Sequence, residues 1–493
     1  MERVSDGTLQ RILFLAINAP LILPPPVNSC RRDFMAVCRR WQRLIESSSA
    51  LWSNVKLLPD SSVHPLLLLS HSQQWLRRTA GLNVTIEFDG DYTSANQGTA
   101  PTETNQLMYG AGHFCFIQHI VLPCANRLTS LTCTIGTNPT IRAFFRIPAG
   151  SFSMLQHMDI LFINQYSDWM SGFTSQELST FTVFRGVGSL RTLILHLLNG
   201  NHPLHLQVPW EQLTILDLGT RAMPPDTARI IIEYSASLVE ACFLMITARG
   251  ISPTLPSRVI ARALRVLHLS LIQPGNEPQM LKRLVFPKLV DLRLELEDTQ
   301  QGWNLEYYIP ILRQAKMLQS LSLAPYKSRI PLIDLSSHQV FTHRNITQSE
   351  IRKFLKTIPM IVSLRLPLAI NISIFVVEAM AYGHFIPLLE TLEVGSIHAD
   401  HIISMVYQRN ELVANAQVAS SRYAESSARD TADTPRGVDR GPPLRVISRL
   451  ILLVEEDVLP SIHDAVRAHQ QNGSTVVNIH IEPHDPRLFY HPK

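Results

Sequence analysis

Cysteine is the residue type in this sequence whose spacing comes closest to that of a metal site. The chain holds six cysteines, and none of them forms a CxxC pair. Cys115, Cys124 and Cys133 are evenly spaced, but the sequence offers no evident fourth ligand for a tetrahedral zinc ion. We therefore expect buried free thiols in a reducing compartment, with a zinc site as the alternative.

Histidines form the second group that could carry chemistry. His196, His202 and His205 lie close together, but Pro203 interrupts them and no acidic residue stands at helical spacing. We expect these histidines to be solvated or at the edge of the core. The sequence also lacks the GxxxxGK phosphate loop, the GxSxG nucleophile elbow and the HExxH zinc motif. It therefore predicts a protein without enzymatic activity, bound metal or cofactor.

The length and composition indicate a large globular protein. The 493 residues exceed the usual range for one hydrophobic core, so several units or a repeat array are expected. Hydrophobic residues make up 45% and charged residues 17%, which excludes wholesale disorder. The net charge of +4 is small for this length and indicates no nucleic-acid partner. No stretch approaches the ~18 apolar residues of a membrane span, so we expect a cytoplasmic or nuclear protein without a membrane partner.

A recurrent apolar pattern organises most of the chain: an apolar residue, two spacers, an apolar residue, one spacer and an apolar residue. Between Leu190 and Leu318 its starts advance by about 23 to 29 residues, as in leucine-rich repeats. The pattern fits a turn that enters a short strand, whose side chains then alternate between core and solvent. One such strand cannot bury its apolar face alone, so stacked copies form a parallel sheet backed by helices. The pattern starts at Leu128, Leu155, Leu190, Leu213, Leu238, Leu264, Leu289 and Leu318, with weaker copies at Ile361, Leu389, Ile447 and Val476.

The expected fold is thus α/β, with an irregular leucine-rich-repeat solenoid. Irregularity is expected because the copies between Leu213 and Leu323 lack the asparagine that normally follows the strand. Thr347 and Glu350 resemble a capping box that starts one helix. The polar stretch 91–106 predicts an exposed loop, and 410–443 predicts a mostly disordered insertion, with a modified or partner-binding loop as the alternative. Helices are expected at 226–235, 278–285, 305–316, 348–357, 374–382, 400–407 and 462–470.

The amino-terminal stretch 34–52 predicts an amphipathic helical segment. Its apolar residues recur at helical spacing, while Arg39 and Arg40 occupy the other face, which we interpret as solvated and not as a nucleic-acid surface. Trp41 and Trp52 are large anchors that another element or another protein must cover, unless they form the core of a small bundle. The flanking elements expected are helices at 8–19, 33–45 (broken near Arg40) and 65–78, and strands at 55–57 and 84–88.

These residues carry a resemblance to a known family. The string VCRRW at 37–41, followed by ALWS at 50–53, resembles the VCRxW…LW core of an F-box. Leu9, Ile12 and Leu13 fit the F-box opening, although Val4-Ser5 replaces Leu-Pro and Gly7 replaces the usual acid. The string WLRRTAGL at 75–82 is similar to a segment that follows the F-box in many fungal F-box proteins. The chain therefore resembles a fungal F-box protein, with an F-box-like all-α domain at 1–58 and a leucine-rich-repeat-like solenoid at 59–493.

The resemblance implies a substrate-receptor subunit of an SCF-type ubiquitin ligase, joined to a cullin complex and holding an unknown protein substrate on its repeats. The alternative is a protein-interaction scaffold with a degenerate F-box that no longer joins a ligase. By resemblance, the residues that dock on the Skp-type adaptor are Leu9, Ile12, Leu13, Val37, Cys38, Trp41, Leu51 and Trp52. The strand positions expected to be exposed, as candidates for substrate binding or simply for solubility, are Arg191, Arg265, His268, Arg293 and Glu295.

Overall fold

The structure is a computed structural model, and it divides the chain into two compact units that we describe separately. The first unit comprises Met1–Arg221 and Tyr234–Leu238, and the second comprises Ala222–Glu233 and Val239–Lys493. The residues described are 4–17, 19–23, 25, 29–57, 65–79, 81–88, 116–135, 138–162, 180–196, 203–246, 258–272, 283–296, 303–325, 346–367, 370, 372–395, 399–427, 443–454, 459–471 and 477–483. The predicted loop at 91–106 and Cys115 lie outside these residues.

The first unit begins with a layer of short helices. They are α1 (Asp6–Ala16), α2 (Cys30–Val37), α3 (Arg39–Ser47) and the 3₁₀ turn η1 (Ser49–Trp52). The predicted helix at 33–45 is divided at Cys38, whose extended backbone separates α2 from α3. Ser5 caps α1 by accepting a hydrogen bond from the Thr8 N–H.

Parallel strands follow this layer in chain order. The expectation of an all-α segment at 1–58 is wrong, because β1 (Leu21–Leu23) pairs with β2 (Asn54–Leu57) and β2 pairs with β3, which places both strands in the same sheet as the repeats. Helix α4 (Pro65–Arg78) and β3 (Val84–Phe88) occupy the predicted positions. The other strands of this series are β1 (Leu21–Leu23), β2 (Asn54–Leu57), β4 (Leu128–Ile135), β5 (His157–Phe162), β6 (Thr192–His196) and β7 (Ile215–Met223). The connections include α7 (Asn138–Phe145) and the short helical turns Ile117–Val121, Leu122–Cys124, Ala125–Arg127, Pro203–His205 and Trp210–Gln212.

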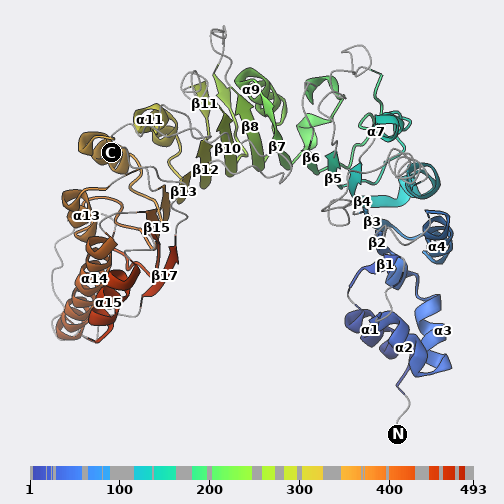
Figure 1. Ribbon diagram of the computed structural model, residues 1–493, viewed down its shortest axis with the longest axis horizontal. Coiled ribbons are helices and arrows are strands. Elements are labelled where there is room, and N and C mark those ends of the chain that lie inside the picture. The colour runs from blue at the N-terminus through green and yellow to red at the C-terminus, as the bar shows by residue number, and fades with distance from the viewer. Residues whose placement is uncertain are drawn as a thin grey trace. The chain divides into compact units, whose positions relative to one another are not determined.

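The second unit repeats a strand and helix alternation. The strands of its long sheet pair in parallel and in chain order, and Figure 1 shows α11 (Leu305–Gln314), α13 (Ile374–Ala381), α14 (Ala399–Ser427) and α15 (Leu459–Gln471) along one face of them. The strands are β8 (Glu240–Ile246), β10 (Val266–Ile272), β12 (Asp291–Leu296), β13 (Ser320–Pro325), β14 (Ser363–Leu366), β15 (Thr391–Gly395), β16 (Arg449–Val454) and β17 (Asn478–Pro483). The helices are α9 (Pro225–Tyr234), α11 (Leu305–Gln314), α12 (Gln348–Lys356), α13 (Ile374–Ala381), α14 (Ala399–Ser427) and α15 (Leu459–Gln471).

The pairing register of the parallel strands explains why the apolar pattern recurs. Leu267, Leu292 and Leu321 are paired across β10, β12 and β13, and all three side chains are buried. Each turn also adds a backbone bond ahead of the strand: the Gln319 N–H donates to Val290 O at 2.9 Å. The Val362 N–H in turn donates to Gln319 O at 2.7 Å. The fold is therefore α/β with parallel, repeat-built strands, and the predicted leucine-rich-repeat-like solenoid architecture is confirmed.

Two predicted segments need correction. Residues 410–427 belong to α14 and are helical, not a disordered insertion, while 428–442 lie outside the described residues. The Asn410 amide explains part of this, because its Nδ2 donates to Ile447 O at 3.0 Å and its Oδ1 accepts from the Ile447 N–H at 2.8 Å. Of the predicted helix 278–285, residues 278–282 lie outside the described residues, and Leu284–Val285 forms the strand β11, which pairs with β9 (Val259–Ile260).

The predicted capping box is present at the start of α12. The Thr347 hydroxyl accepts from the Glu350 N–H at 3.2 Å, and Glu350 accepts from the Thr347 N–H at 2.8 Å. Thr347→Ala should therefore lower the free energy of unfolding by about 1 kcal/mol, because the Glu350 N–H in the first turn of α12 loses its hydrogen-bond acceptor. Urea unfolding would measure this loss, with exposed Ser349→Ala as the matched control. Equal midpoints for the two variants would contradict the assigned role of the cap.

Candidate binding surfaces

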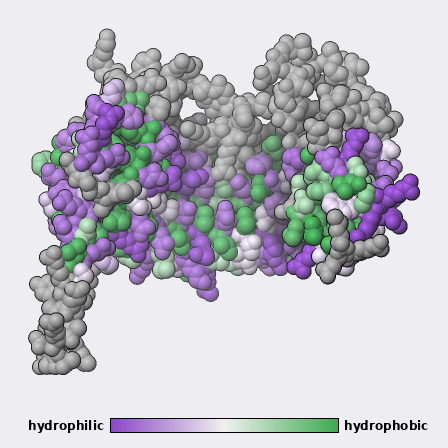
Figure 2. Space-filling view, turned by 90° about the horizontal axis from the view of Figure 1, so that it is seen from below, coloured by the Kyte–Doolittle hydropathy of each residue, from purple (hydrophilic) through white to green (hydrophobic). Residues whose placement is uncertain are grey.

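The helical layer of the first unit presents apolar side chains to solvent. Leu15 of α1 is 70% exposed and Val37 of α2 is 59% exposed, while Ile12 and Phe14 are also exposed. Figure 2 shows green atoms over these helices at the right-hand end of the view. We call Ile12, Phe14, Leu15 and Val37 the apolar helix face. A patch of exposed apolar side chains on a protein surface commonly marks an interaction site.

The eight residues assigned to adaptor docking divide into two sets. Ile12, Val37 and Cys38 are exposed, and Trp41 is half-buried with its ring 5.7 Å from that of Phe34. The residues packed inside the protein are Leu9, Leu13, Leu51 and Trp52. Phe14 and Leu15 are also exposed, although the family resemblance did not mark them. Helix α1 is apolar over much of its circumference, so residues that do not face inward with Leu9 and Leu13 must face solvent.

Trp52 joins the helical layer to the first strands. Its indole N–H donates to Ile45 O at 2.9 Å, and the Arg78 guanidinium lies 4.5 Å from its ring centre. The Arg31 guanidinium lies on the same ring system at 5.7 Å and donates to Leu51 O at 2.9 Å. Burial lowers the pKa of Arg31. The Trp75 indole N–H also donates to the carbonyl oxygen of Trp52. Trp52 is thus a central packing residue of its own chain.

The residues predicted to bind a substrate do not all occupy exposed positions within strands. Arg191 and Arg265 are exposed, but each lies just before a strand, β6 and β10 respectively. Arg293 is exposed within β12. His268 is 8% exposed, so its expected exposure is wrong. The reason is the neighbouring strand: Glu295 Oε1 lies 3.0 Å from His268 Nε2, and the Ser270 hydroxyl donates to Glu295 Oε2 at 3.0 Å.

The solvent-side positions of the strands carry paired charges. In the first unit Lys56 lies 2.5 Å from Glu87, and His196 lies 3.8 Å from Asp159. Burial raises the pKa of Asp159, against the attraction of His196. In the second unit Arg365 lies 2.8 Å from Glu393, whose pKa burial likewise raises. These pairs make the strand face polar and leave it without a dominant sign of charge.

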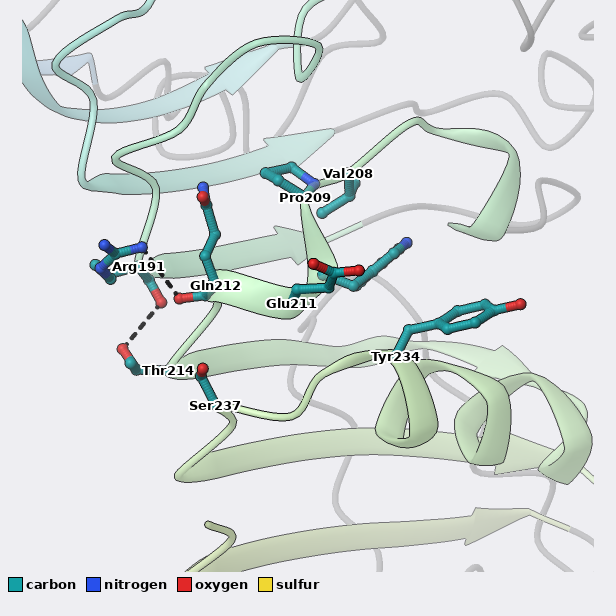
Figure 3. A pocket seen from close by; sticks show the side chains of 9 residues that line it. Arg191, Val208, Pro209, Glu211, Gln212, Thr214, Tyr234 and Ser237 are labelled. Atoms are coloured by element: carbon teal, nitrogen blue, oxygen red, sulfur yellow. Dashed lines mark hydrogen bonds between the residues drawn. The ribbon is translucent and has the colours of Figure 1, made fainter. Parts of the chain in front are cut away.

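A cavity of about 670 Å³ opens in the first unit at the amino ends of β6 and β7. Arg191 and Thr214 line one side of it and Tyr234 the opposite side (Figure 3). Thr214 Oγ1 donates to Arg191 O at 3.1 Å, and Arg191 Nη1 donates to Gln212 O at 3.3 Å, which fixes that wall. The volume lies within the range of small-ligand pockets. The full lining is Arg191, Val208, Pro209, Trp210, Glu211, Gln212, Thr214, Tyr234 and Ser237.

The cysteines of the described residues are free thiols. Cys124, Cys133 and Cys242 are buried, and burial raises the pKa of the Cys124 thiol to about 12. Cys30 and Cys38 are exposed, so the expectation of burial is wrong for these two. Within the part of the chain that the structure describes, no group of three or more His, Cys, Asp or Glu could hold a metal ion. No described helix has the length and apolar content to cross a membrane.

No known protein family and no curated protein matches this chain. One similar solved structure is a crystal structure of a TLR13–ssRNA13 complex, at 13% identity and a TM-score of 0.29. The match covers 71% of this chain and 52% of that one, so this chain spans about half the length of the matched protein. The assignment of the fold rests on the strand register described above.

Proposed function

We propose that this chain is the substrate receptor of an SCF-type ubiquitin ligase. The helices α1 to α3 dock on a Skp-type adaptor, and the repeats bind a protein substrate. The observation that carries this proposal is the apolar helix face, Ile12, Phe14, Leu15 and Val37, which lies on the segment that resembles an F-box. The polar, mixed-charge strand face supports substrate binding, because such surfaces suit specific protein recognition.

The chain acts without bond chemistry of its own. Its contribution is effective concentration, since tethering a substrate beside the ligase makes the encounter intramolecular at a local level of order mM. The burial of Leu9, Leu13, Leu51 and Trp52 gives these residues a supporting role, so the direct contacts come from the apolar helix face and Trp41. The complex operates in the cytoplasm or the nucleus, without a cofactor.

Binding of the purified chain to a Skp-type adaptor tests the proposal by calorimetry. Leu15→Glu and Val37→Glu should each weaken binding at least tenfold, about 1.4 kcal/mol, because a carboxylate would be buried against the adaptor. Both residues are exposed, so circular dichroism should show an unchanged fold.

Leu82→Glu is the matched control, because Leu82 is an exposed apolar residue of the same unit, outside the helical layer. This variant should bind the adaptor with the affinity of the wild-type protein. If the unchanged chain shows no affinity for the adaptor and brings down no cullin, the ligase role is wrong. The scaffold with a degenerate F-box, favoured by Val4-Ser5 and Gly7, would then be the better description.

A further inference from the structure

In the second unit, the turns before neighbouring strands place apolar side chains at one repeat position. This position immediately precedes the first apolar residue of the repeat pattern. Met317, Met360 and Val446 occupy it before β13, β14 and β16, and they are 54%, 47% and 39% exposed. Leu388 occupies it before β15 and is buried. We call these four residues the methionine row.

Strand pairing sets the spacing of the methionine row. Strands β13, β14, β15 and β16 are consecutive neighbours in parallel register. Neighbouring strands lie about 4.8 Å apart, so the row extends over roughly 14 Å. This length suits a helix laid across the strands, whose successive turns are about 5.4 Å apart. Methionine side chains adapt to varied apolar partners, which favours their use on binding surfaces.

Positive charge lies beside the methionine row. Helices α11 and α12 end at the turns that carry Met317 and Met360, and there Arg313, Lys316 and Lys356 are exposed. Among the described residues, none of these three cations forms an ion pair with a carboxylate. A cation near the carboxyl end of a helix is stabilised by the negative end of the helix dipole. Three full positive charges exceed the partial negative charges of two helix ends, so the surface here remains positive.

Nearby acids do not cancel this charge. Glu390 forms an ion pair with Arg445, which precedes Val446. Glu378 is exposed one turn before Tyr382 at the end of α13, and its single negative charge is smaller than the charge of the three cations. The exposed side chains of the row, Met317, Met360 and Val446, with a cationic border are complementary to a segment that carries apolar side chains among carboxylates.

We propose that the methionine row binds an acidic amphipathic helix of a protein partner. Apolar side chains at i, i+3 or i+4, and i+7 of that helix, the spacing of one helical face, contact Met360 and its neighbours. Its glutamates and aspartates meet Lys316 and Lys356. The site lies on the edge formed by the strand-entry turns of the second unit, whereas the apolar helix face belongs to the first unit. It is independent of adaptor binding, so a chain that failed to bind the adaptor would retain it.

Two fluorescein-labelled helical peptides test the proposal with the full chain. Both carry leucine on one face, and the remaining positions are glutamate in one peptide and lysine in the other. Fluorescence anisotropy should show at least tenfold tighter binding of the glutamate peptide, and this preference should shrink as salt is raised. Equal affinities for the two peptides, or no binding of the glutamate peptide, would overturn the proposal.

Variants locate the binding to this surface. Met317→Ser with Met360→Ser should weaken binding of the glutamate peptide at least tenfold, and Lys316→Glu with Lys356→Glu should abolish the preference for it. Met154→Ser is the matched control, because Met154 is exposed at the same repeat position before β5, in the first unit. All the substituted side chains are exposed, so the fold should be retained. An equal loss in the control variant, or unchanged binding in the double methionine variant, would contradict the assignment.

Discussion

Replacing Arg409 by methionine should lower the free energy of unfolding of the second unit by about 3 kcal/mol or more, because buried carbonyl groups lose charge-assisted hydrogen bonds. Arg409 is fully buried on α14. Its Nε donates to Arg445 O at 2.8 Å, and its Nη1 donates to Met380 O at 2.9 Å. No carboxylate among the described residues pairs with it. Backbone carbonyls therefore replace a counter-ion in stabilising the charge.

The guanidinium also fixes a constrained turn. Arg409 Nη2 donates to Ile386 O at 3.2 Å, and Ile386 has the positive φ of 43°, which is unfavourable for a branched residue. The same Nη2 also donates to Pro387 O and to Leu389 O. Burial lowers the pKa of Arg409 to about 10, so it is cationic at neutral pH. One side chain thus connects α13, the turn before β15 and the segment that leads into β16.

Urea unfolding with matched variants measures the effect. Arg409→Lys should give an intermediate loss, because a single ammonium group cannot reach carbonyls on all sides. Arg467→Met on α15 is the control, since Arg467 is an exposed arginine in a surface pair with Asp464, and its loss should stay within about 0.5 kcal/mol. If Arg409→Met unfolds at the same urea concentration as that control, the carbonyl bonds contribute no net stability.

Trp52→Ala should cost about 3–5 kcal/mol, the range for removing a large buried aromatic side chain. The loss should be local to the helical layer. The indole contacts Ile45 O of α3, Arg31 of α2 and Arg78 of α4, so its removal takes away contacts that join these three helices. Hydrogen exchange should therefore rise in α1 to α3, while the strands of the second unit keep their protection.

Trp41→Ala is the informative comparison. Trp41 is half-buried, with its ring 5.7 Å from that of Phe34, so its removal should cost less stability than the removal of the buried Trp52. If adaptor binding depends on direct contact, Trp41→Ala should weaken it while exchange in α1 to α3 stays low. Faster exchange in Trp41→Ala than in Trp52→Ala would contradict the assignment of Trp52 as the central packing residue.

Local patterns in the sequence were sufficient for the repeating elements. Alternation of apolar and polar residues predicted β3 and β12, and the Thr347 and Glu350 pair predicted the start of α12. These features depend on neighbours within a few positions, so the chain encodes them directly. The length of α14 escaped the same reasoning. Its second half is polar, and part of its stability comes from the distant bonds of Arg409 and Asn410 to the strand-entry segment near Ile447.

The composition of the binding surfaces was predicted only in part. The sequence marked the amino-terminal segment and its apolar residues, but amphipathic spacing cannot say which of several apolar residues on one helix face inward. Leu13 is buried while Leu15 of the same helix is exposed, and Trp52 is covered by the distant Arg78. The methionine row joins residues from four repeats that only strand pairing makes adjacent. The sequence alone therefore determined the repeat architecture, because periodic burial is a local property. The tertiary structure decided which side chains remain exposed, because exposure depends on contacts between distant segments.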